Sequence, residues 1–185
     1  VAASLNFRDV LTALGQMPGA PADEPPIGIE CSGRIHSVGS AVSGFAPGDP
    51  VVAFARHALA SHAVTPATNA IPLTRNISFE DAAGIPCVFL TADYALNNIG
   101  RLKRGERVLI HAATGGVGLA AVQIARQMGT EIFATAGSTE KREYLRRLGV
   151  EHVFDSRSLE FADDIRSATD GEGVDLVLNS LGGEF

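Results

Sequence analysis

The sequence predicts an α/β protein in which a doubly wound parallel sheet follows a β-rich segment. From residue 107 onward, strand-like and helix-like segments alternate at the spacing of βαβ units, which build parallel sheets. Residues 31–55 contain short alternating segments separated by glycine, serine and proline, which is typical of a β-barrel or part of one. The glycine-rich turn His111–Gly118 lies between the first strand and the first helix predicted for the α/β part.

The amino-terminal half is predicted to contain short strands and many turns. Ile35–Val38 and Val51–Phe54 are predicted strands, because both are short alternating segments bounded by turn residues. Pro18–Pro26 is predicted to be a loop, since its prolines fix φ and remove backbone donors. Residues 79–99 have few turn residues and suit helices. We therefore expect a change of structural class near residue 80.

The α/β half is predicted to alternate between strands and helices up to the last residues. The apolar run Arg107–Ala113 is typical of a parallel strand that is buried on both faces. Ser138 can cap a helix that runs to Leu148, with Gly149 just beyond its end. The other predicted strands are Glu131–Ala136, His152–Phe154 and Val174–Asn179, and the other predicted helices are Gly118–Met128 and Leu159–Ala168.

The composition is that of an ordinary globular protein and excludes several classes. Of the 185 residues, 45% are hydrophobic and 19% are charged, and the net charge of −6 argues against a nucleic-acid partner. One basic group is interpreted as the solvated face of a helix: Lys141, Arg142, Arg146 and Arg147. No apolar stretch approaches the ~18 residues of a membrane span, so no membrane association is expected. The isolated Cys31 and Cys87 are interpreted as small apolar core residues, and a cytoplasmic location is expected.

The glycine-rich turn fits the dinucleotide-binding fingerprint G-x-G-x-x-G, with alanine in place of the first glycine. The residues predicted to contact a cofactor there are Ala113, Thr114, Gly115, Gly116, Val117 and Gly118. Gly115 would let a pyrophosphate lie against the backbone, and Gly118 would let the helix pack close to the strand. The amino terminus of the helix then faces the phosphates with its N–H groups and positive dipole end. A glycine turn can also serve packing alone, but here the flanking strand and helices are those that the motif requires.

The residues after the second predicted strand favour NADP over NAD. An NAD site places an acidic residue there to bind the ribose 2′-hydroxyl, whereas this strand ends Thr135-Ala136-Gly137-Ser138 and the first carboxylate is Glu140, inside the next helix. Ser138, Lys141 and Arg157 instead suit a 2′-phosphate, which takes hydrogen-bond donors and positive charge. The alternative is that Ser138 is only a helix cap and Lys141 is only solvated, and both roles are compatible.

Longer stretches carry a resemblance to a known family. HAATGGVGLAAVQIA (residues 111–125) resembles the zinc-independent, quinone-oxidoreductase-like branch of the medium-chain dehydrogenase/reductases. LNFRDVLTALG (5–15), DSRS (155–158) and GVDLVLNSLGGEF (173–185) are similar to the enoyl reductase domain of a modular (type I) polyketide synthase. The resemblance implies that residues 1–78 are part of a GroES-like β-barrel domain, which is the catalytic (substrate) domain. It implies that residues 79–185 are a C-terminally incomplete, NADP-binding domain with a Rossmann-type doubly wound parallel sheet.

The resemblance also implies a reaction and its partners. The reaction is the NADPH-dependent reduction of a trans-2-enoyl thioester, with hydride transfer to the β-carbon and a proton reaching the α-carbon. The partners are an acyl carrier protein that carries the enoyl substrate on its phosphopantetheine, the other domains of the same megasynthase, and a second copy in a homodimer. The alternatives are a free-standing NADPH quinone or enal oxidoreductase and a non-catalytic nucleotide-binding remnant within a synthase.

A catalytic zinc ion is not expected. Many relatives carry a Gly-His-Glu motif near the barrel, but this chain has Gly28-Ile29-Glu30, with isoleucine in place of the ligand histidine. The segment around Asn6 holds no cysteine, although the zinc enzymes have a cysteine ligand there. Reduction of an activated C=C bond does not require a metal, so we expect no metal site.

Candidates for the nicotinamide end of the site follow from the resemblance alone. Asn6, Thr91 and Asn179 match family positions near the nicotinamide, although Asn6 and Thr91 could equally serve their local backbone. The proton donor is not assigned: Asn6 and Tyr94 are weak catalytic candidates, and both tyrosines, Tyr94 and Tyr144, are better interpreted as packing residues. His111 is interpreted as a packed strand residue.

Overall fold

The structure is a computed structural model, and it describes residues 1–17 and 27–180. The chain packs into two compact units, Val1–Cys87 and Val88–Phe185, each of which is described by itself. The division falls within helix α3 (Pro86–Asp93). Helix α2 (Phe79–Ala83), which precedes α3, belongs to the first unit and packs against its strands. The predicted loop Pro18–Pro26 lies outside the described residues.

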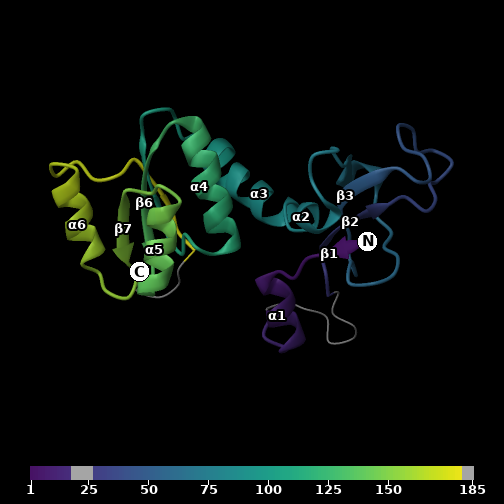
Figure 1. Ribbon diagram of the computed structural model, residues 1–185, viewed down its shortest axis with the longest axis horizontal. Helices are drawn as coiled ribbons and strands as arrows, with labels where there is room; N and C mark the ends of the chain where they lie inside the picture. Colours follow the sequence, from purple (N-terminus) through teal and green to yellow (C-terminus); the bar gives the residue numbers. More distant parts are fainter. Residues whose placement is uncertain (18–26, 181–185) are drawn as a thin grey trace. The chain divides into compact units, whose positions relative to one another are not determined.

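The first unit is built on an antiparallel sheet with the strand order β1-β2-β3-β4 (Figure 1). Its strands are β1 (Ala2–Ala3), β2 (Glu30–Arg34), β3 (Pro50–Phe54) and β4 (Ala70–Pro72). Its helices, besides α2, are α1 (Phe7–Ala13) and the 3₁₀ turn η1 (Ala67–Asn69). The predicted strand Val51–Phe54 is confirmed.

The predicted strand Ile35–Val38 is wrong, since the strand in this region is β2, which ends at Arg34. Ile35 still pairs with the chain before β3: its N–H donates to Asp49 O (3.0 Å), and its carbonyl accepts from Gly48 N–H (2.8 Å). Gly48 has a φ of 95°, so the backbone turns away there and the ladder cannot continue. The alternation in the sequence therefore identified the neighbourhood of the strand but not its position.

The second unit is built on a parallel sheet with the order β7-β6-β5-β8 (Figure 1). Its strands are β5 (Arg107–Ile110), β6 (Glu131–Ala136), β7 (His152–Asp155) and β8 (Leu176–Leu178). The helices that follow α3 are the π-helical η2 (Tyr94–Ile99), α4 (Gly116–Met128), α5 (Thr139–Arg147) and α6 (Phe161–Ala168). The predicted alternation of strands and helices and the parallel sheet are confirmed.

The first strand of this sheet is shorter than predicted: it was expected over Arg107–Ala113 and ends at Ile110. The reason is conformational: Ala112 adopts a left-handed φ of 47°, which no strand residue can have. The helix α4 correspondingly begins at Gly116, two residues before the predicted start. The turn between them therefore spans residues 111–115 and begins earlier than the apolar run suggests.

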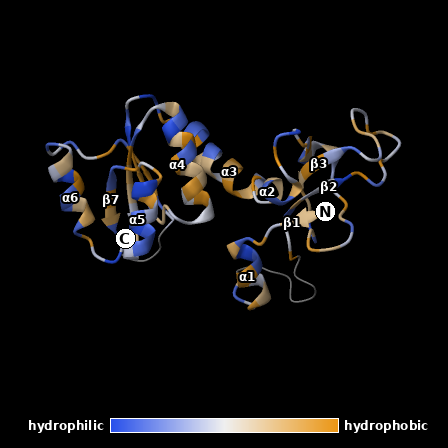
Figure 2. Cartoon of the chain, viewed as in Figure 1, coloured by the Kyte–Doolittle hydropathy of each residue, from blue (hydrophilic) through white to orange (hydrophobic). Residues whose placement is uncertain are grey.

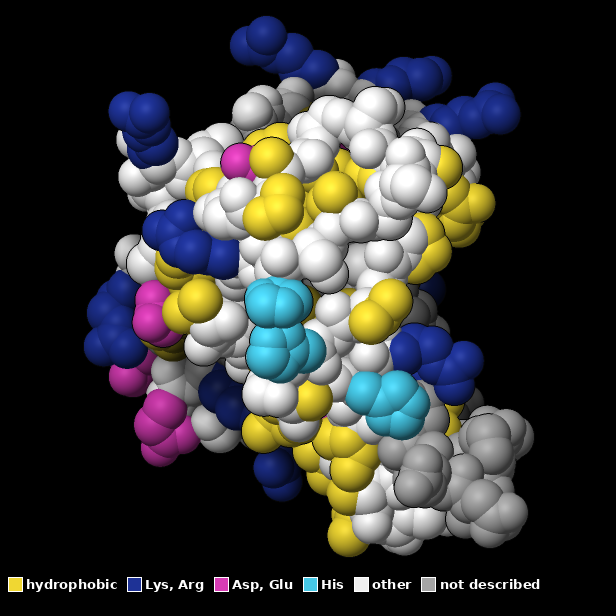
Figure 3. All heavy atoms as spheres, turned by 90° about the vertical axis from the view of Figure 1, so that its right-hand side faces the viewer, with side chains coloured by type: hydrophobic (Ala, Val, Ile, Leu, Met, Phe, Trp, Pro, Cys, Tyr) yellow, Lys and Arg dark blue, Asp and Glu magenta, His cyan; other side chains and the backbone are white. Residues whose placement is uncertain are grey.

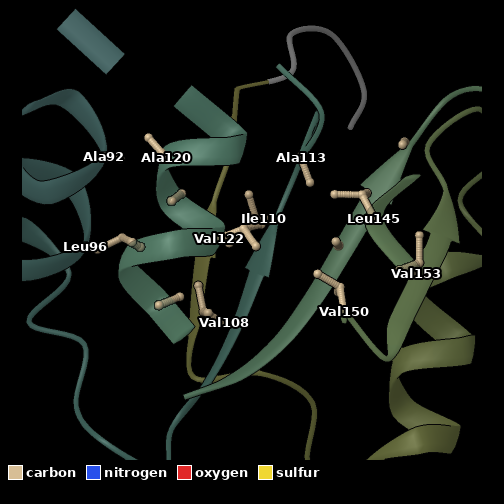
Figure 4. Packing of buried hydrophobic residues seen from close by; sticks show 14 of the residues in the cluster. Ala92, Leu96, Val108, Ile110, Ala113, Ala120, Val122, Leu145, Val150 and Val153 are labelled. Atoms are coloured by element: carbon tan, nitrogen blue, oxygen red, sulfur yellow. The ribbon is translucent and has the colours of Figure 1, made fainter. Parts of the chain in front are cut away.

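The hydrophobic core of the second unit lies on both faces of the parallel sheet. On one face, Val108 and Ile110 of β5 pack with Val122 of α4 and Leu145 of α5 (Figure 4). On the other face, a second cluster joins Leu109, Phe133, Phe161 and Ile165, so α6 covers that side. Alternate residues of β5 point to opposite faces, as the strand period requires. Figure 2 shows the hydrophilic residues gathered on the outer helix α5, in contrast to the hydrophobic sheet.

The first unit has a cavity of about 940 Å³ beside its antiparallel sheet. Residues of β1, β2 and β3 and of the loops that follow β2 and β3 line it. His36 and His62 are among them, and their rings meet edge to face at 5.2 Å; Figure 3 shows histidine side chains on this side of the molecule.

Cys31 also lines the cavity, and burial raises the pKa of its thiol. Neither cysteine forms a disulfide bond, and both are half-buried rather than fully in the core as expected.

Candidate functional site

The glycine-rich turn packs the start of α4 directly onto the end of β5. A Cβ atom at Gly118 would lie 2.5 Å from Ala112 O and 2.6 Å from Ala113 Cα, distances that no folded structure accommodates without a shift of backbone. The N–H of Gly115 donates to Ala112 O (2.8 Å), which closes the turn. Gly118 therefore permits the close packing of helix against strand that the fingerprint predicts.

The exposed part of the turn is its middle. Gly115 and Gly116 are exposed and stand at the amino terminus of α4, where the first N–H groups of a helix have no intrahelical acceptors. Thr114 and Val117 are half-buried, whereas Ala113 is fully buried. Any contact between Ala113 and a ligand would have to involve its backbone. The turn thus presents backbone N–H groups and a positive helix end to an anion.

The three residues predicted to favour NADP lie around the carboxyl ends of β6 and β7. The Ser138 hydroxyl caps α5, since it accepts from Lys141 N–H (3.3 Å). The Arg157 side chain lies against Gly137, where an added Cβ would be 3.2 Å from its Nε atom. Lys141 is exposed in the first turn of α5. Glu140 lies next to these residues in the first turn of α5. A hydrogen bond from the Ser138 side chain lowers the pKa of its carboxyl group.

Sequence reasoning missed two residues that organise this edge, Arg142 and Asp155. The Arg142 Nη1 atom lies 2.9 Å from Asp155 Oδ2 and donates to Ala136 O (3.2 Å), so it joins the ends of β6 and β7. Asp155 Oδ1 in turn accepts from Arg157 N–H (2.9 Å), which anchors the residue whose side chain covers Gly137. The interpretation of Arg142 as part of a solvated helix face is therefore wrong. No local pattern indicated it, because the contact depends on strand order.

His111, just before the turn, is packed as expected. Its Nδ1 atom lies 2.8 Å from Thr135 Oγ1, and its ring meets Phe161 edge to face at 5.2 Å. The side chain is buried, and burial lowers the pKa of the imidazole. His111 therefore links β5 and β6 as a neutral ring directly beneath the glycine turn.

Because burial lowers the pKa of His111, we expect the stability of the protein to fall as the pH falls below about 6.5, the ordinary pKa of histidine. The unfolded chain takes up a proton there while the folded His111 does not, so the unfolded state gains stability relative to the folded state. Urea unfolding between pH 7.5 and 5, measured for the wild type and for His111→Asn, tests this. The free energy of unfolding should fall less steeply with pH in the variant, and parallel curves would contradict the expectation.

Of the residues predicted for the nicotinamide end, Asn6 belongs to the first unit, and Thr91 and Asn179 belong to the second. Asn6 precedes α1 in the first unit, and its side chain donates to the buried Glu30 (2.8 Å) rather than serving only its local backbone. Thr91 lies on α3, and Asn179 directly follows β8; both are exposed. Tyr94 is 61% exposed and Tyr144 is 42% exposed, so their interpretation as packing residues is wrong.

Comparisons with known proteins identify two families that match separate parts of the chain. The alcohol dehydrogenase GroES-like domain family matches residues 1–77, and the zinc-binding dehydrogenase family matches residues 116–185. One polypeptide of the phenolphthiocerol/phthiocerol polyketide synthase of Mycobacterium tuberculosis is 51% identical over 184 residues, which cover all of this chain and 8% of that polypeptide. The chain thus spans a small fraction of the curated relatives that it matches.

Two solved structures show the same fold. The crystal structure of CurK enoyl reductase has a TM-score of 0.92 and 46% identity, and the match covers 99% of this chain and 57% of that chain. Mycobacterial Rv1454c, solved in complex with NADPH, has a TM-score of 0.88 and 33% identity, with 98% of this chain and 57% of that chain covered.

The residues present do not fit the zinc ion that one of these family descriptions names. Within residues 1–17 and 27–180, no group of three or more His, Cys, Asp and Glu side chains could hold a metal ion. Ile29 supplies no ligand atom where the zinc enzymes have histidine. In the same described part of the chain, no helix is long and apolar enough to cross a membrane.

One family match lies within each unit, with the GroES-like match in the first unit and the dehydrogenase match in the second. High identity to polyketide synthases and to a solved enoyl reductase extends over nearly the whole chain. The chain therefore belongs to the medium-chain dehydrogenase/reductase superfamily, and within it to the enoyl reductase domains of polyketide synthases.

Proposed function

We propose that the native polypeptide that carries this chain reduces the C=C bond of a trans-2-enoyl thioester with NADPH. A hydride is added to the β-carbon and a proton to the α-carbon, so the product is the saturated acyl thioester and the oxidised cofactor is NADP⁺. The observation that carries the proposal is the glycine turn packed by Gly118, with Ser138, Lys141 and Arg157 beyond the ends of the neighbouring strands. The solved NADPH complex of a relative with the same fold supports the choice of cofactor.

The residues of the turn fit a dinucleotide. A Cβ at Gly116 would lie 2.8 Å from Val88 Cγ1, and one at Gly115 would lie 3.2 Å from Ala112 O, so both positions leave little room for a side chain. Both glycines are nevertheless exposed, so the backbone at the amino terminus of α4 is open to a pyrophosphate. Lys141 and Arg157 would hold the 2′-phosphate by charge-assisted hydrogen bonds, with the Arg142–Asp155 pair anchoring the loop that carries Arg157. When bound, NADPH supplies the hydride that reduces the β-carbon.

The other end of the site is assigned by resemblance. Asn6, Thr91 and Asn179 would contact the nicotinamide end of the cofactor, and Tyr94 stays a candidate for the proton donor. The substrate thioester would be carried by the phosphopantetheine of an acyl carrier protein, and the relatives that span whole synthases support other domains of the same megasynthase as partners. The homodimer stays a prediction.

The choice of cofactor is tested by titrating the native polypeptide with NADPH and with NADH, followed by nicotinamide fluorescence. We expect NADPH to bind at least about tenfold more tightly, a difference of ~1.4 kcal/mol. Lys141→Ala combined with Arg157→Ala should remove most of that preference while leaving the affinity for NADH within about twofold, because only the 2′-phosphate loses its partners.

Arg147→Ala is the matched control, since Arg147 is exposed in the last turn of the same helix. It should leave both affinities unchanged. Equal binding of the two cofactors by the wild type would overturn the assignment to NADP. Tight NADPH binding without turnover of an enoyl-pantetheine would support the cofactor site but overturn the proposed reaction.

A further inference from the structure

Glu30 is a buried carboxylate that gathers three hydrogen-bond donors. The residue is 1% exposed in β2. Its Oε1 atom accepts from Ser4 Oγ (2.5 Å) and from Asn6 Nδ2 (2.8 Å), and its Oε2 atom accepts from Cys87 N–H (2.6 Å). Within the described part of the chain, no lysine or arginine forms an ion pair with it. A buried carboxyl group is costly unless its oxygens are hydrogen-bonded, and these three donors satisfy them here.

The contact with Glu30 sets the direction of the Asn6 carboxamide. The Nδ2 atom of Asn6 is the donor to Glu30 Oε1, so the NH₂ group of Asn6 faces Glu30 and its Oδ1 atom points elsewhere. The backbone of Asn6 is held as well, because its N–H donates to Oδ2 of the buried Asp9 (2.8 Å). Asp9 Oδ1 also accepts from Gly28 N–H (2.9 Å), two residues before Glu30. Two buried carboxylates therefore fix both the backbone and the side chain of Asn6.

We propose that Glu30 is a positioning residue for the reduction: its carboxylate orients the Asn6 carboxamide and so holds that side chain ready for the nicotinamide end of the site. The proposal rests on the proposed function, in which Asn6 contacts the cofactor. Glu30 acts through Asn6 and does not touch the reacting atoms. A neutral amide at position 30 has only one acceptor oxygen, so it cannot satisfy the donors on both sides of the carboxylate. The Asn6 side chain then loses its single defined orientation.

The test is a cycle of Glu30→Gln, Asn6→Ala and the double variant in the native polypeptide, with kcat measured on an enoyl-pantetheine and NADPH. Misplacing a positioning group lowers turnover by about 10- to 100-fold, and we expect a loss of kcat of that order for Glu30→Gln. The Kd for NADPH should stay within about twofold. In the Asn6→Ala background, Glu30→Gln should cause no further loss of kcat, because the group that it orients is gone.

Ser32→Ala is the structural control. Ser32 lies on the same strand, is equally buried and donates to Phe79 O (2.5 Å), but it does not contact Asn6. It should lower the Tm and leave kcat unchanged. A role of Glu30 in stability alone would make Glu30→Gln behave like Ser32→Ala, and that result would overturn the proposal, as would a loss of kcat that is the same with and without Asn6.

A failure of the proposed function looks different. The wild type would then bind NADPH but reduce no enoyl thioester, and the cycle would be measured by thermal unfolding instead. Shifts in Tm that are additive for Glu30→Gln and Asn6→Ala would overturn the positioning contact itself. Non-additive shifts would support the contact and place the failure in the assigned reaction.

Discussion

Replacing Gly118 with alanine is expected to abolish NADPH binding and to destabilise the protein by about 3 kcal/mol. The new Cβ atom would lie 2.5 Å from Ala112 O, 2.6 Å from Ala113 Cα and 2.8 Å from Ala113 C. All three are backbone atoms of the turn and cannot move aside as a flexible side chain would. Either α4 separates from β5 or the turn opens, and both changes remove the surface proposed for the pyrophosphate. Urea unfolding and an NADPH titration of the native polypeptide measure the two effects.

Gly39→Ala is the control for the substitution itself. A Cβ at Gly39 would have Val42 Cγ2 as its nearest neighbour, at 3.9 Å, and Gly39 does not need a positive φ. We expect a change in stability within about 0.5 kcal/mol and an unchanged affinity for NADPH. A Gly118→Ala protein with wild-type affinity and stability would show that the helix and the strand can separate at little cost.

Replacing Phe133 with alanine is expected to lower the free energy of unfolding by about 3–5 kcal/mol, the largest loss of stability among the changes considered. Phe133 is fully buried in β6, and its ring is stacked on His152 at 4.4 Å and packs in one cluster with Leu109 and Ile165. Removing it leaves a cavity between the sheet and α6 that these neighbours cannot fill. Since domains are stable by only about 5–15 kcal/mol, such a loss leaves the second unit marginal. Urea unfolding at constant pH measures it.

Tyr144→Ala is the matched control, because Tyr144 is also aromatic but is 42% exposed on α5. Its loss should be below about 1 kcal/mol, since little apolar surface leaves the core. Equal losses for the two variants would mean that the face of the sheet covered by α6 contributes little to stability. That outcome would also contradict the two-sided core described for the parallel sheet.

Much of the second unit could be predicted from local sequence, and the physical reason is that its signals are short-range. Glu131–Ala136 was predicted with the bounds of β6, because an apolar run between a helix and a capping residue has few alternatives. Ser138 was identified as the cap of α5 from its position before the helix. The place of Gly118 in the fingerprint predicts close packing of the helix on the strand. The structure agrees, because a Cβ at Gly118 would collide with the backbone at the end of the strand.

The first unit was predicted less well, since its strands are short and its turns are irregular. Alternation near residue 35 indicated a strand at Ile35–Val38, but the strand is Glu30–Arg34, whose residues pair with β3. The segment ECSGR has two polar ends and a glycine, so no periodic pattern marks it. Pairing with a partner strand decided its position.

The sequence by itself determined the class of fold, the parallel sheet and the glycine turn, because each of these follows from periodicity or from the absence of a side chain within a few residues. Only the tertiary structure decided which polar and charged residues act together. Arg142 meets Asp155 because β6 and β7 are neighbours, and Glu30 meets Asn6 across 24 positions of sequence because β2 lies beside the start of α1. Local patterns cannot identify such pairs, because the residues that meet are far apart in the sequence and only the packing of the elements brings them into contact.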